Sequence, residues 1–391
     1  MSEAGAGAPP DTGDPAAVGW RDEARRDLLA ALPGWITARL VVLVALGLAH
    51  LVAQRIDPGL EPLVHRRLRQ GLLAWDGDWY LRIADRGYAD LPEESLRFFP
   101  LYPLLARGLG TLLFGSTAVA LLVLANLPAL LLGGLVHRLT LRETDDAALA
   151  RRAAWLIALV PPFFVMVMGY GEPISLCLAV AAFLALRRQR WEWAAAAGFL
   201  AGLARPVGVL LAIPAAIEAA RGLRAAGVGE RLRRALPVVA PVAGVGAFLA
   251  WVWIRFDDPL LPLRVQNRAY LRGGWSNPLA IVAETVGDLA GGEFGRNALH
   301  LPWIVVFTAL VVVSFRRWPA SYATFAAASL VLAVSARNLG SFERYGFGAF
   351  PVVLALASVT AGDWSERMVV SLSIALMTGY ATVAFLNLYV P

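Results

Sequence analysis

The sequence predicts an all-α integral membrane protein, a multi-pass helical bundle of about 11 spans. Hydrophobic residues make up 58% of the 391-residue chain and charged residues only 16%, whereas soluble domains carry about 25% charged residues. Apolar runs of roughly 17–25 residues, the length that crosses a hydrocarbon core, recur from end to end. An outer-membrane barrel would instead show short segments in which apolar and polar residues alternate. A helical bundle is therefore the predicted fold class.

The first element is a polar tail. Residues 1–30 are predicted to form a disordered N-terminal tail, and residues 31–391 the membrane domain. Residues 1–19 are rich in Gly, Ala, Pro and Asp, and no basic segment precedes an apolar stretch there. This composition favours disorder over a cleaved signal peptide.

The predicted spans follow the tail as separate apolar segments. In chain order they are residues 33–53, 116–137, 153–169, 173–187, 191–204, 206–220, 236–254, 300–315, 319–335, 347–361 and 368–388.

The distribution of arginine predicts the orientation, with the N-terminus cytoplasmic. All 35 basic residues are arginine, and 18 of them lie in short connections assigned to the inside, where the positive-inside rule is most reliable. The opposite side has short links at 170–172, 205 and 336–346 and two long loops, at about 54–97 and 255–299. The chain is thus predicted to be a multi-pass protein of the cell membrane. Because its arginines are scattered between apolar spans, the net charge of +6 does not indicate a nucleic-acid partner.

Residues 98–115 are predicted not to span the membrane. As a full span, this segment would reverse the side of every later connection and place the basic ones outside. Pro100 and Pro103 suit the first turn of a helix and disfavour its interior. We expect a juxtamembrane or re-entrant helix here.

No disulfide, metal centre or other cofactor is predicted. Cys177 is the only cysteine, so an intrachain disulfide is impossible. An Asp-x-Asp pair alone is a weak signal for a divalent metal. The histidines are far apart and lack the spacing of metal ligands: His50, His65, His137 and His300.

Residues 75–88 are predicted to form an amphipathic helix in the membrane interface. Trp75, Trp79 and Ile83 share one helical face, expected to point toward lipid, and Gly87 is a candidate C-cap. Asp76 and Asp78 are two residues apart, so their side chains diverge on a helix. One carboxylate can then act as a base while the other binds or orients. The alternative is a solvated helix with ordinary surface acids.

Three further ionisable groups lie in short links on the same predicted side. Glu172 and Arg205 each stand between two apolar segments, and Arg344 follows Glu343. Charged groups at such depth usually face a cavity or a partner, and an arginine can bind a phosphate with two hydrogen bonds. The alternatives are a carboxylate that reaches interfacial water, a snorkelling arginine, and mutual neutralisation of Glu343 and Arg344.

The motifs together resemble a known family. Residues 75–88 (Trp-Asp-Gly-Asp-Trp-Tyr-Leu-Arg-Ile-Ala-Asp-Arg-Gly-Tyr) and 98–103 (Phe-Phe-Pro-Leu-Tyr-Pro) look like the signature of the PIG-V family, which includes GPI mannosyltransferase II. The resemblance covers roughly residues 75–351. Its later elements are residues 170–172, residues 202–208, Gln266 after Asp258-Pro259, and Arg344-Tyr345 before Phe350-Pro351.

The resemblance implies a GT-C-type glycosyltransferase whose long first outer loop carries interfacial helices. Such enzymes transfer a sugar, typically mannose, from a polyprenyl-phosphate donor to an acceptor on the outer membrane face. A carboxylate in the first large outer loop, here Asp76, acts as the base. The residues implied in donor or acceptor binding are Asp78, Trp79, Tyr80, Glu172, Arg205, Gln266, Arg344 and Tyr345.

This chemistry needs few groups. The donor phosphate is already a good leaving group, so a base for the acceptor hydroxyl and cations for the phosphate charge suffice. Asp76 supplies the first, and Arg205 with Arg344 the second. One carboxylate in a direct displacement predicts inversion at the anomeric carbon.

Two other classes stay open at this stage. A transporter or flippase of a lipid-linked or anionic solute should show repeated halves and helices broken at the midplane. A scaffold subunit that kept the fold without catalysis is the other alternative, and the presence of Asp76 with its arginines argues mildly against it. The expected partners are the lipid bilayer, the lipid-linked donor and an acceptor.

Overall fold

A computed structural model describes residues 19–56, 62–293 and 295–391. Within these ranges no β-strand forms, and Trp275 and Ala336 make one isolated antiparallel bridge. The α-helices are α1 (Trp20–Ile56), α2 (Pro62–Gln70), α3 (Asp76–Arg86), α4 (Leu101–Leu112), α5 (Thr117–Thr144), α6 (Ala147–Leu159), α7 (Glu172–Arg187), α8 (Trp191–Ala204), α9 (Ala212–Ala220), α10 (Val228–Phe256), α11 (Leu261–Gln266), α12 (Pro278–Ala290), α13 (Leu301–Arg317), α14 (Ala320–Val334), α15 (Phe342–Gly348), α16 (Phe350–Val359) and α17 (Asp363–Phe385). Short 3₁₀ helices join them: η1 (Gly71–Leu73), η2 (Glu93–Arg97), η3 (Pro161–Met166), η4 (Pro206–Leu211), η5 (Leu223–Ala225) and η6 (Arg296–His300).

The prediction of an all-α, multi-pass membrane protein is confirmed. Among the described residues, five helices are long and apolar enough to cross a membrane: Trp20–Arg55, Thr117–Thr144, Val228–Phe256, Asn297–Arg317 and Asp363–Phe385. Shorter apolar helices cover Pro206–Ala220, Ala320–Val334 and Phe350–Val359. The predicted count of about 11 spans is not confirmed.

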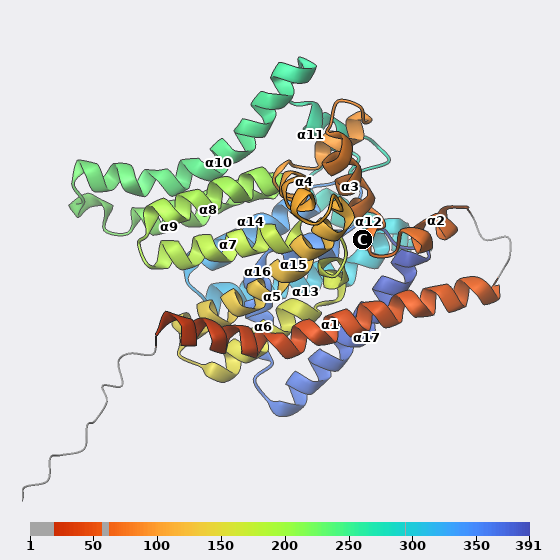
Figure 1. The fold of residues 1–391 in the computed structure, drawn as a ribbon. Coiled ribbons are helices and arrows are strands. Elements are labelled where there is room, and N and C mark those ends of the chain that lie inside the picture. The colour runs from red at the N-terminus through yellow and green to blue at the C-terminus, as the bar shows by residue number, and fades with distance from the viewer. Residues whose placement is uncertain (1–18, 57–61, 294) are drawn as a thin grey trace, which may run out of the picture.

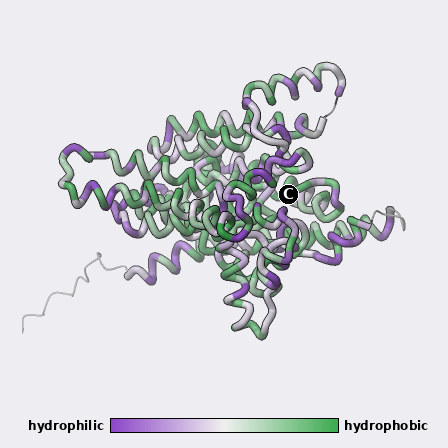
Figure 2. The backbone as a smooth tube through the Cα atoms, turned by 90° about the horizontal axis from the view of Figure 1, so that it is seen from above, coloured by the Kyte–Doolittle hydropathy of each residue, from purple (hydrophilic) through white to green (hydrophobic). Residues whose placement is uncertain are grey.

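α1, α7 and α8 run roughly side by side and give the bundle two ends, whereas the second half of α10 and all of α17 are inclined to them (Figure 1). α10 and α7 both pack along α8, and α5 packs against α1, α6 and α7. The helix interiors are mostly hydrophobic, and hydrophilic segments concentrate at the turns and ends (Figure 2). Close contact of α8 with α10 requires glycine, because a Cβ at Gly202 or Gly244 would overlap the backbone of the facing helix.

The predicted tail boundary is wrong. α1 begins at Trp20, inside the segment assigned to the tail, while residues 1–18 lie outside the described residues. Asp22 and Glu23 in the first turn favour the helix N-terminus. Asp27 accepts hydrogen bonds from His137 Nδ1 at 2.7 Å and Arg138 Nε at 2.6 Å. These contacts to α5 hold residues 20–30 in helical form, which their composition alone did not indicate.

Two predicted spans are interrupted rather than continuous. The segment 153–169 divides into α6 and η3 at Pro161, and 347–361 divides between α15 and α16 at Ala349, with Pro351 in the first turn of α16. Proline has no backbone N–H and clashes with the preceding turn, so a helix restarts at such a residue instead of passing through it.

Residues 98–115 form a short helix, as expected. α4 has 12 residues, about 18 Å at 1.5 Å per residue, which is shorter than the roughly 30 Å hydrocarbon core. Pro100 is its N-cap, and Pro103 lies in its first turn. Tyr102 is buried and donates its hydroxyl to Leu121 O at 2.8 Å, which fixes α4 against α5.

α3 forms where a helix was predicted, but the prediction that its aromatic face points toward lipid is wrong. Gly87 is the C-cap with φ 78°, as expected. Trp75, however, precedes the helix, and its Nε1 donates to Ala384 O of α17 at 2.9 Å. Ile83 is buried, and Trp79 stacks on Phe98. This face packs against protein instead of lipid, because α4 and α17 cover it.

Candidate functional site

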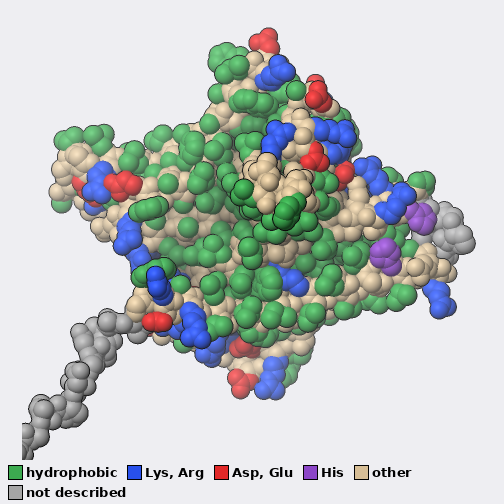
Figure 3. All heavy atoms as spheres, in the orientation of Figure 1, with side chains coloured by type: hydrophobic (Ala, Val, Ile, Leu, Met, Phe, Trp, Pro, Cys, Tyr) green, Lys and Arg blue, Asp and Glu red, His purple; other side chains and the backbone are tan. Residues whose placement is uncertain are grey.

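Four of the motifs converge in space. Asp76 begins α3, Glu172 begins α7, Arg205 follows α8, and Arg344 lies in α15. We refer to Asp76, Glu172, Arg205 and Arg344 as the acid–arginine cluster. Two of its members are carboxylates at helix N-termini, where the helix dipole favours negative charge. Charged side chains also gather over α2, α3 and α11 at this end of the molecule (Figure 3).

Asp76 reaches Arg344 across the fold. Its Oδ2 accepts a hydrogen bond from Arg344 Nη1 at 2.9 Å, and its Oδ1 lies 3.9 Å from Arg97 Nη2. The Asp76 backbone N–H donates to the Tyr170 hydroxyl at 3.3 Å. The side chain is 20% exposed, so Oδ1 is accessible while Oδ2 is bound.

The turn before Asp76 is strained. Trp75 has φ 61°, a value that a bulky residue rarely adopts. Its indole is held by the hydrogen bond to Ala384 and by the Arg67 guanidinium, 3.9 Å from the ring centroid. Such strain persists only where surrounding contacts enforce it. Here those contacts direct Asp76 toward Arg344.

Glu172 is the most enclosed member of the cluster. It is 5% exposed, pairs with Arg205, and has Oε1 3.4 Å from Arg344 Nη1. Despite this charge pairing, neither of its carboxylate oxygens has a partner with hydrogen-bond geometry among the described residues. A buried carboxylate with open lone pairs is suited to accept hydrogen bonds from ligand hydroxyls.

Several N–H groups around the cluster are also open. Arg97 Nε, Arg344 Nε and Arg272 Nη1 are buried and lack a hydrogen-bond partner in the described part of the chain. Arg272 reaches this region from the second outer loop, and its guanidinium lies 4.6 Å from the Tyr345 ring centroid. Together with Arg205 these make four arginines, and the cluster holds only two acids, Asp76 and Glu172. Positive charge is therefore in excess. The arrangement is complementary to an anion.

Tyr345 lies among these arginines. Burial opposes ionisation of its phenol, but Arg344, Arg272 and Arg205 together lower its pKa below the usual value. The ring centroid is 6.0 Å from Arg205 and 5.5 Å from Arg344. The lowered pKa of Tyr345 thus indicates a positive electrostatic potential at the site.

Tyr80 and Trp79 line the α3 side. Tyr80 is buried, packs edge-on against Phe98 and Tyr102, and approaches Gly171 beside Glu172 through its hydroxyl. Trp79 is sandwiched between Phe98 and the Arg82 guanidinium. Only Tyr80 approaches the cluster directly.

Asp78 points away from Asp76, as the helical spacing predicted. It pairs with Arg66 at 2.9 Å and with Arg82, four residues later, at 3.0 Å. Both partners are on the solvent side of α2 and α3. This pairing makes Asp78 an anchor between the two helices.

Two residues of the motifs do not join the cluster. Gln266 ends α11, and its side chain makes no hydrogen bond within the described residues, while its backbone carbonyl accepts one from the Arg272 N–H at 3.1 Å. The alternative that Glu343 neutralises Arg344 is wrong, because Glu343 faces His300 Nδ1 at 2.7 Å and Tyr389 at 3.1 Å. Adjacent residues of α15 therefore point to different partners.

Arg97 and Arg272 were not predicted as site residues. Arg97 directly precedes the Phe98-Phe99-Pro100 motif, and that position could have indicated it. Arg272 has no distinguishing signal, since Arg264 and Arg268 lie in the same loop.

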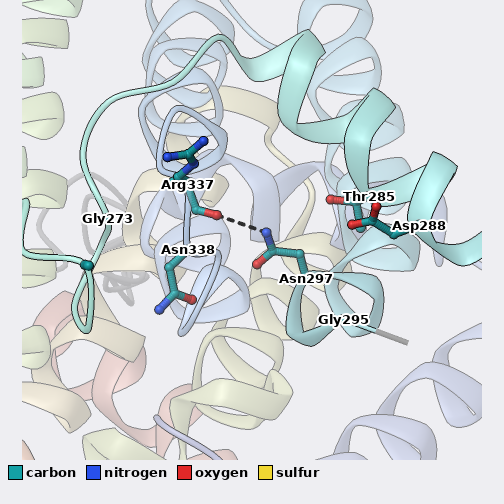
Figure 4. A pocket seen from close by; sticks show the side chains of 8 residues that line it. Gly273, Thr285, Asp288, Gly295, Asn297, Arg337 and Asn338 are labelled. Atoms are coloured by element: carbon teal, nitrogen blue, oxygen red, sulfur yellow. Dashed lines mark hydrogen bonds between the residues drawn. The ribbon is translucent and has the colours of Figure 1, made fainter. Parts of the chain in front are cut away.

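The described residues contain no group of three or more His, Cys, Asp or Glu side chains placed to hold a metal ion. A cavity of about 360 Å³ lies between α12, η6, the second outer loop at Ala269 and Gly273, and the segment before α15 (Figure 4). Asn297 on its wall donates to Arg337 O at 3.0 Å and accepts from Leu339 N at 3.0 Å. Its amide is thus used to join η6 to this segment.

Comparison with known proteins gives distant similarities. No protein-family model and no curated protein matches the chain. The Archaeoglobus fulgidus oligosaccharyltransferase with zinc and sulfate is 16% identical, with a TM-score of 0.40, covering 80% of this chain and 48% of that one. The archaeal oligosaccharyltransferase AglB of the same organism, with an inhibitory peptide and a dolichol-phosphate, is 14% identical, with a TM-score of 0.40 and coverage of 92% and 56%. The chain spans about half the length of these structures, and similarities of this extent do not define its activity.

Proposed function

We propose that this chain is a membrane glycosyltransferase that moves a sugar, mannose on the basis of its PIG-V-like motifs, from a polyprenyl-phosphate donor to an acceptor hydroxyl. The observation that carries the proposal is the acid–arginine cluster, with open N–H groups on Arg97, Arg272 and Arg344 beside an accessible Asp76 oxygen. The extracytoplasmic face is the expected location, from the arginine distribution.

The excess positive charge fits the reaction. A polyprenyl-phosphate sugar carries about one negative charge, and the polyprenyl phosphate that leaves carries nearly two. Guanidinium groups preorganised at that position stabilise the charge as it develops. Arg205 and Arg344 are assigned to this role, with Arg97 and Arg272 as further donors.

Asp76 is assigned as the base. Its Oδ1 is free to take the proton of the acceptor hydroxyl, while Oδ2 is held by Arg344. The acceptor oxygen bonds to the anomeric carbon, the bond from that carbon to the phosphate oxygen breaks, and the phosphate leaves with its electron pair. One displacement inverts the anomeric configuration. Glu172, which is enclosed and whose Oε2 has no partner among the described residues, is assigned to sugar hydroxyls.

The direct test is transfer by the purified chain. Polyprenyl-phosphate-[³H]mannose and membrane lipids should yield a new labelled product, and Asp76→Asn should not form it. Asp78→Asn is the matched control, because it removes the same charge two residues away. Movement of the intact lipid-linked sugar across proteoliposomes without transfer would overturn the proposal in favour of a transporter.

A further inference from the structure

We infer that the end of the bundle opposite the acid–arginine cluster contains a binding site for a phosphate ester, formed by Arg142 and Arg188. The distance between the two sites follows from α7, which begins at Glu172 and ends at Arg187. A helix of 16 residues is about 22 Å from its first residue to its last. The inferred site is therefore separate from the proposed transfer site and does not depend on it.

The site is a cavity between the last turns of α5 and α7. Its volume is about 240 Å³, and its lining residues are Leu139, Arg142, Glu143, Leu184, Arg187 and Arg188. Arginine side chains are visible along this edge of the molecule, where α1 begins (Figure 3). The walls thus combine guanidinium groups with leucine side chains.

The acid in the cavity is already neutralised. Arg187 donates to both Glu143 oxygens, at 2.7 and 3.1 Å, and Tyr322 donates to the same carboxylate at 3.1 Å. Arg187 also reaches Glu218 at 3.4 Å. Glu143 is therefore not available to pair with Arg142 or Arg188.

Arg142 and Arg188 differ in their acidic partners. The acidic contact of Arg142 is a long one, 3.4 Å to Glu23, and Arg188 has no acidic group within 4.0 Å in the described part of the chain. The C-terminal ends of α5 and α7 offset part of this charge, about half a unit each. Arg188 is the guanidinium left without an acid, and Arg142 adds further N–H donors because its single contact to Glu23 is long and partly exposed, so a phosphate oxygen can replace it.

The chemistry favours a phosphate ester over a carboxylate or a free halide. Two guanidinium groups present several N–H donors to the oxygens of one phosphate. Leu139 and Leu184 provide an apolar wall beside them. Such basic pockets between membrane helices suit phospholipid head groups, and a soluble phosphate ester offers the same oxygens.

The test uses the full chain and three probes. Binding of phosphatidylglycerol, phosphatidylcholine and inorganic phosphate to the detergent-solubilised protein is measured by native mass spectrometry and by thermal stabilisation. Phosphatidylglycerol should bind better than phosphatidylcholine. The double variant Arg142→Gln/Arg188→Gln should bind it about tenfold or more weakly, because charged hydrogen bonds are lost. Arg190→Gln/Arg224→Gln removes the same charge from exposed positions outside the cavity and should change affinity less than about twofold.

Each outcome of this test either supports or overturns the inference. Equal losses in the two double variants would overturn the inference, since surface charge would then explain binding. Failure of the wild type to bind either phosphatidylglycerol or inorganic phosphate would also overturn it. Equal binding of inorganic phosphate, lost in Arg142→Gln/Arg188→Gln, would support the site and identify a soluble ester as its ligand. If the double variant does not fold, Arg188→Gln alone, at an exposed position, should still weaken binding.

Discussion

The two ends of α7 both bury ion pairs, but they differ in how completely their polar atoms are hydrogen-bonded. At the Arg187 end, Glu143 and Glu218 receive hydrogen bonds from Arg187, Tyr322 and Ser321. At the Glu172 end, Oε1 of the carboxylate is in contact with Arg205 and Arg344, whereas Oε2 and three neighbouring arginine N–H groups have no hydrogen-bond partner in the described part of the chain. A fully bonded network adds rigidity, whereas open buried groups are costly unless a ligand pairs them. The open end is therefore the candidate for chemistry and the closed network the candidate for stability.

Membrane topology is the strongest test of this contrast, because its result is all or none. In a Cys177→Ala background, Ala89→Cys and Ala269→Cys near the open end should react with an impermeant thiol reagent from outside. Gly229→Cys at the other end should react only after the membrane is permeabilised. All three positions are exposed. Labelling of Gly229→Cys from outside would place the closed end on the outer face and contradict the orientation.

Loss of the Asp76 base should have the largest effect on rate. Asp76→Asn keeps the shape and removes the basicity, so turnover should fall by about 10²–10⁴-fold while folding and donor binding persist. Transfer rates and donor-analogue binding are measured at matched expression. Asp78→Asn should have a smaller effect, because its carboxylate pairs with Arg66 and Arg82. Near-normal turnover of Asp76→Asn together with an inactive Glu172→Gln would assign the base to Glu172.

Loss of Arg187 should have the largest effect on stability. Arg187→Met leaves Glu143 buried without its guanidinium, while Glu218 keeps Arg221 at 3.3 Å, and the loss should reduce the free energy of unfolding by about 3–5 kcal/mol. Thermal unfolding in detergent measures this change. Glu172→Gln is the matched variant at the open end: it removes the acid that pairs with Arg205 and Arg344, but should destabilise less, since Gln keeps the shape and a polar oxygen where Met keeps none. Equal destabilisation by both variants would remove the distinction between the two ends.

A subtler change tests whether the open end binds phosphate. Arg205→Lys keeps the charge but loses the planar guanidinium. The stabilisation of the transition state should therefore fall by about 1–3 kcal/mol, with a matching loss of activity. Binding of a polyprenyl-phosphate analogue, measured by competition, should weaken in parallel. Arg264→Lys, at an exposed arginine of the second outer loop, is the control. Unchanged analogue binding would give Arg205 a structural role beside Glu172.

The smallest expected effect concerns the loops that supply Arg97 and Arg272. Arg268 pairs with Glu93 and Glu94, and the Tyr270 hydroxyl donates to Glu94 at 2.6 Å. Tyr270, together with Arg268, holds the pKa of the Glu94 carboxyl below its usual value. The stabilisation from this contact is thus fully present above the ordinary glutamate pKa of about 4.3. It is lost as the pH falls through the lowered pKa of Glu94.

A spin label at Ala269→Cys should therefore be immobile at pH 7 and become mobile only once the pH falls below the ordinary glutamate pKa of about 4.3. Arg268→Gln should make the label mobile at pH 7 as well as at low pH. This result would distinguish loss of the Arg268 contacts from general unfolding in acid. A label in Arg268→Gln that stays immobile at pH 7 would show that other contacts join the loops.

Much of the fold was available from local sequence signals. The length of apolar runs indicated helices that cross a membrane, and five helices meet that description. The paired prolines near residue 100 indicated the short α4, and Gly87 indicated the end of α3. The predicted continuity of residues 153–169 was wrong, because Pro161 and Pro162 end α6 and begin η3 within this apolar segment.

The sequence by itself determined the elements and the residue types of the candidate site. Apolar length, proline positions and arginine bias act over a few turns of one chain segment, so they can be read without a fold. Only the tertiary structure decided which charges meet. Asp76 and Arg344 are 268 positions apart, and Glu343 and Arg344 are adjacent but face different partners. Pairing between distant segments depends on how helices pack, and no local pattern encodes it.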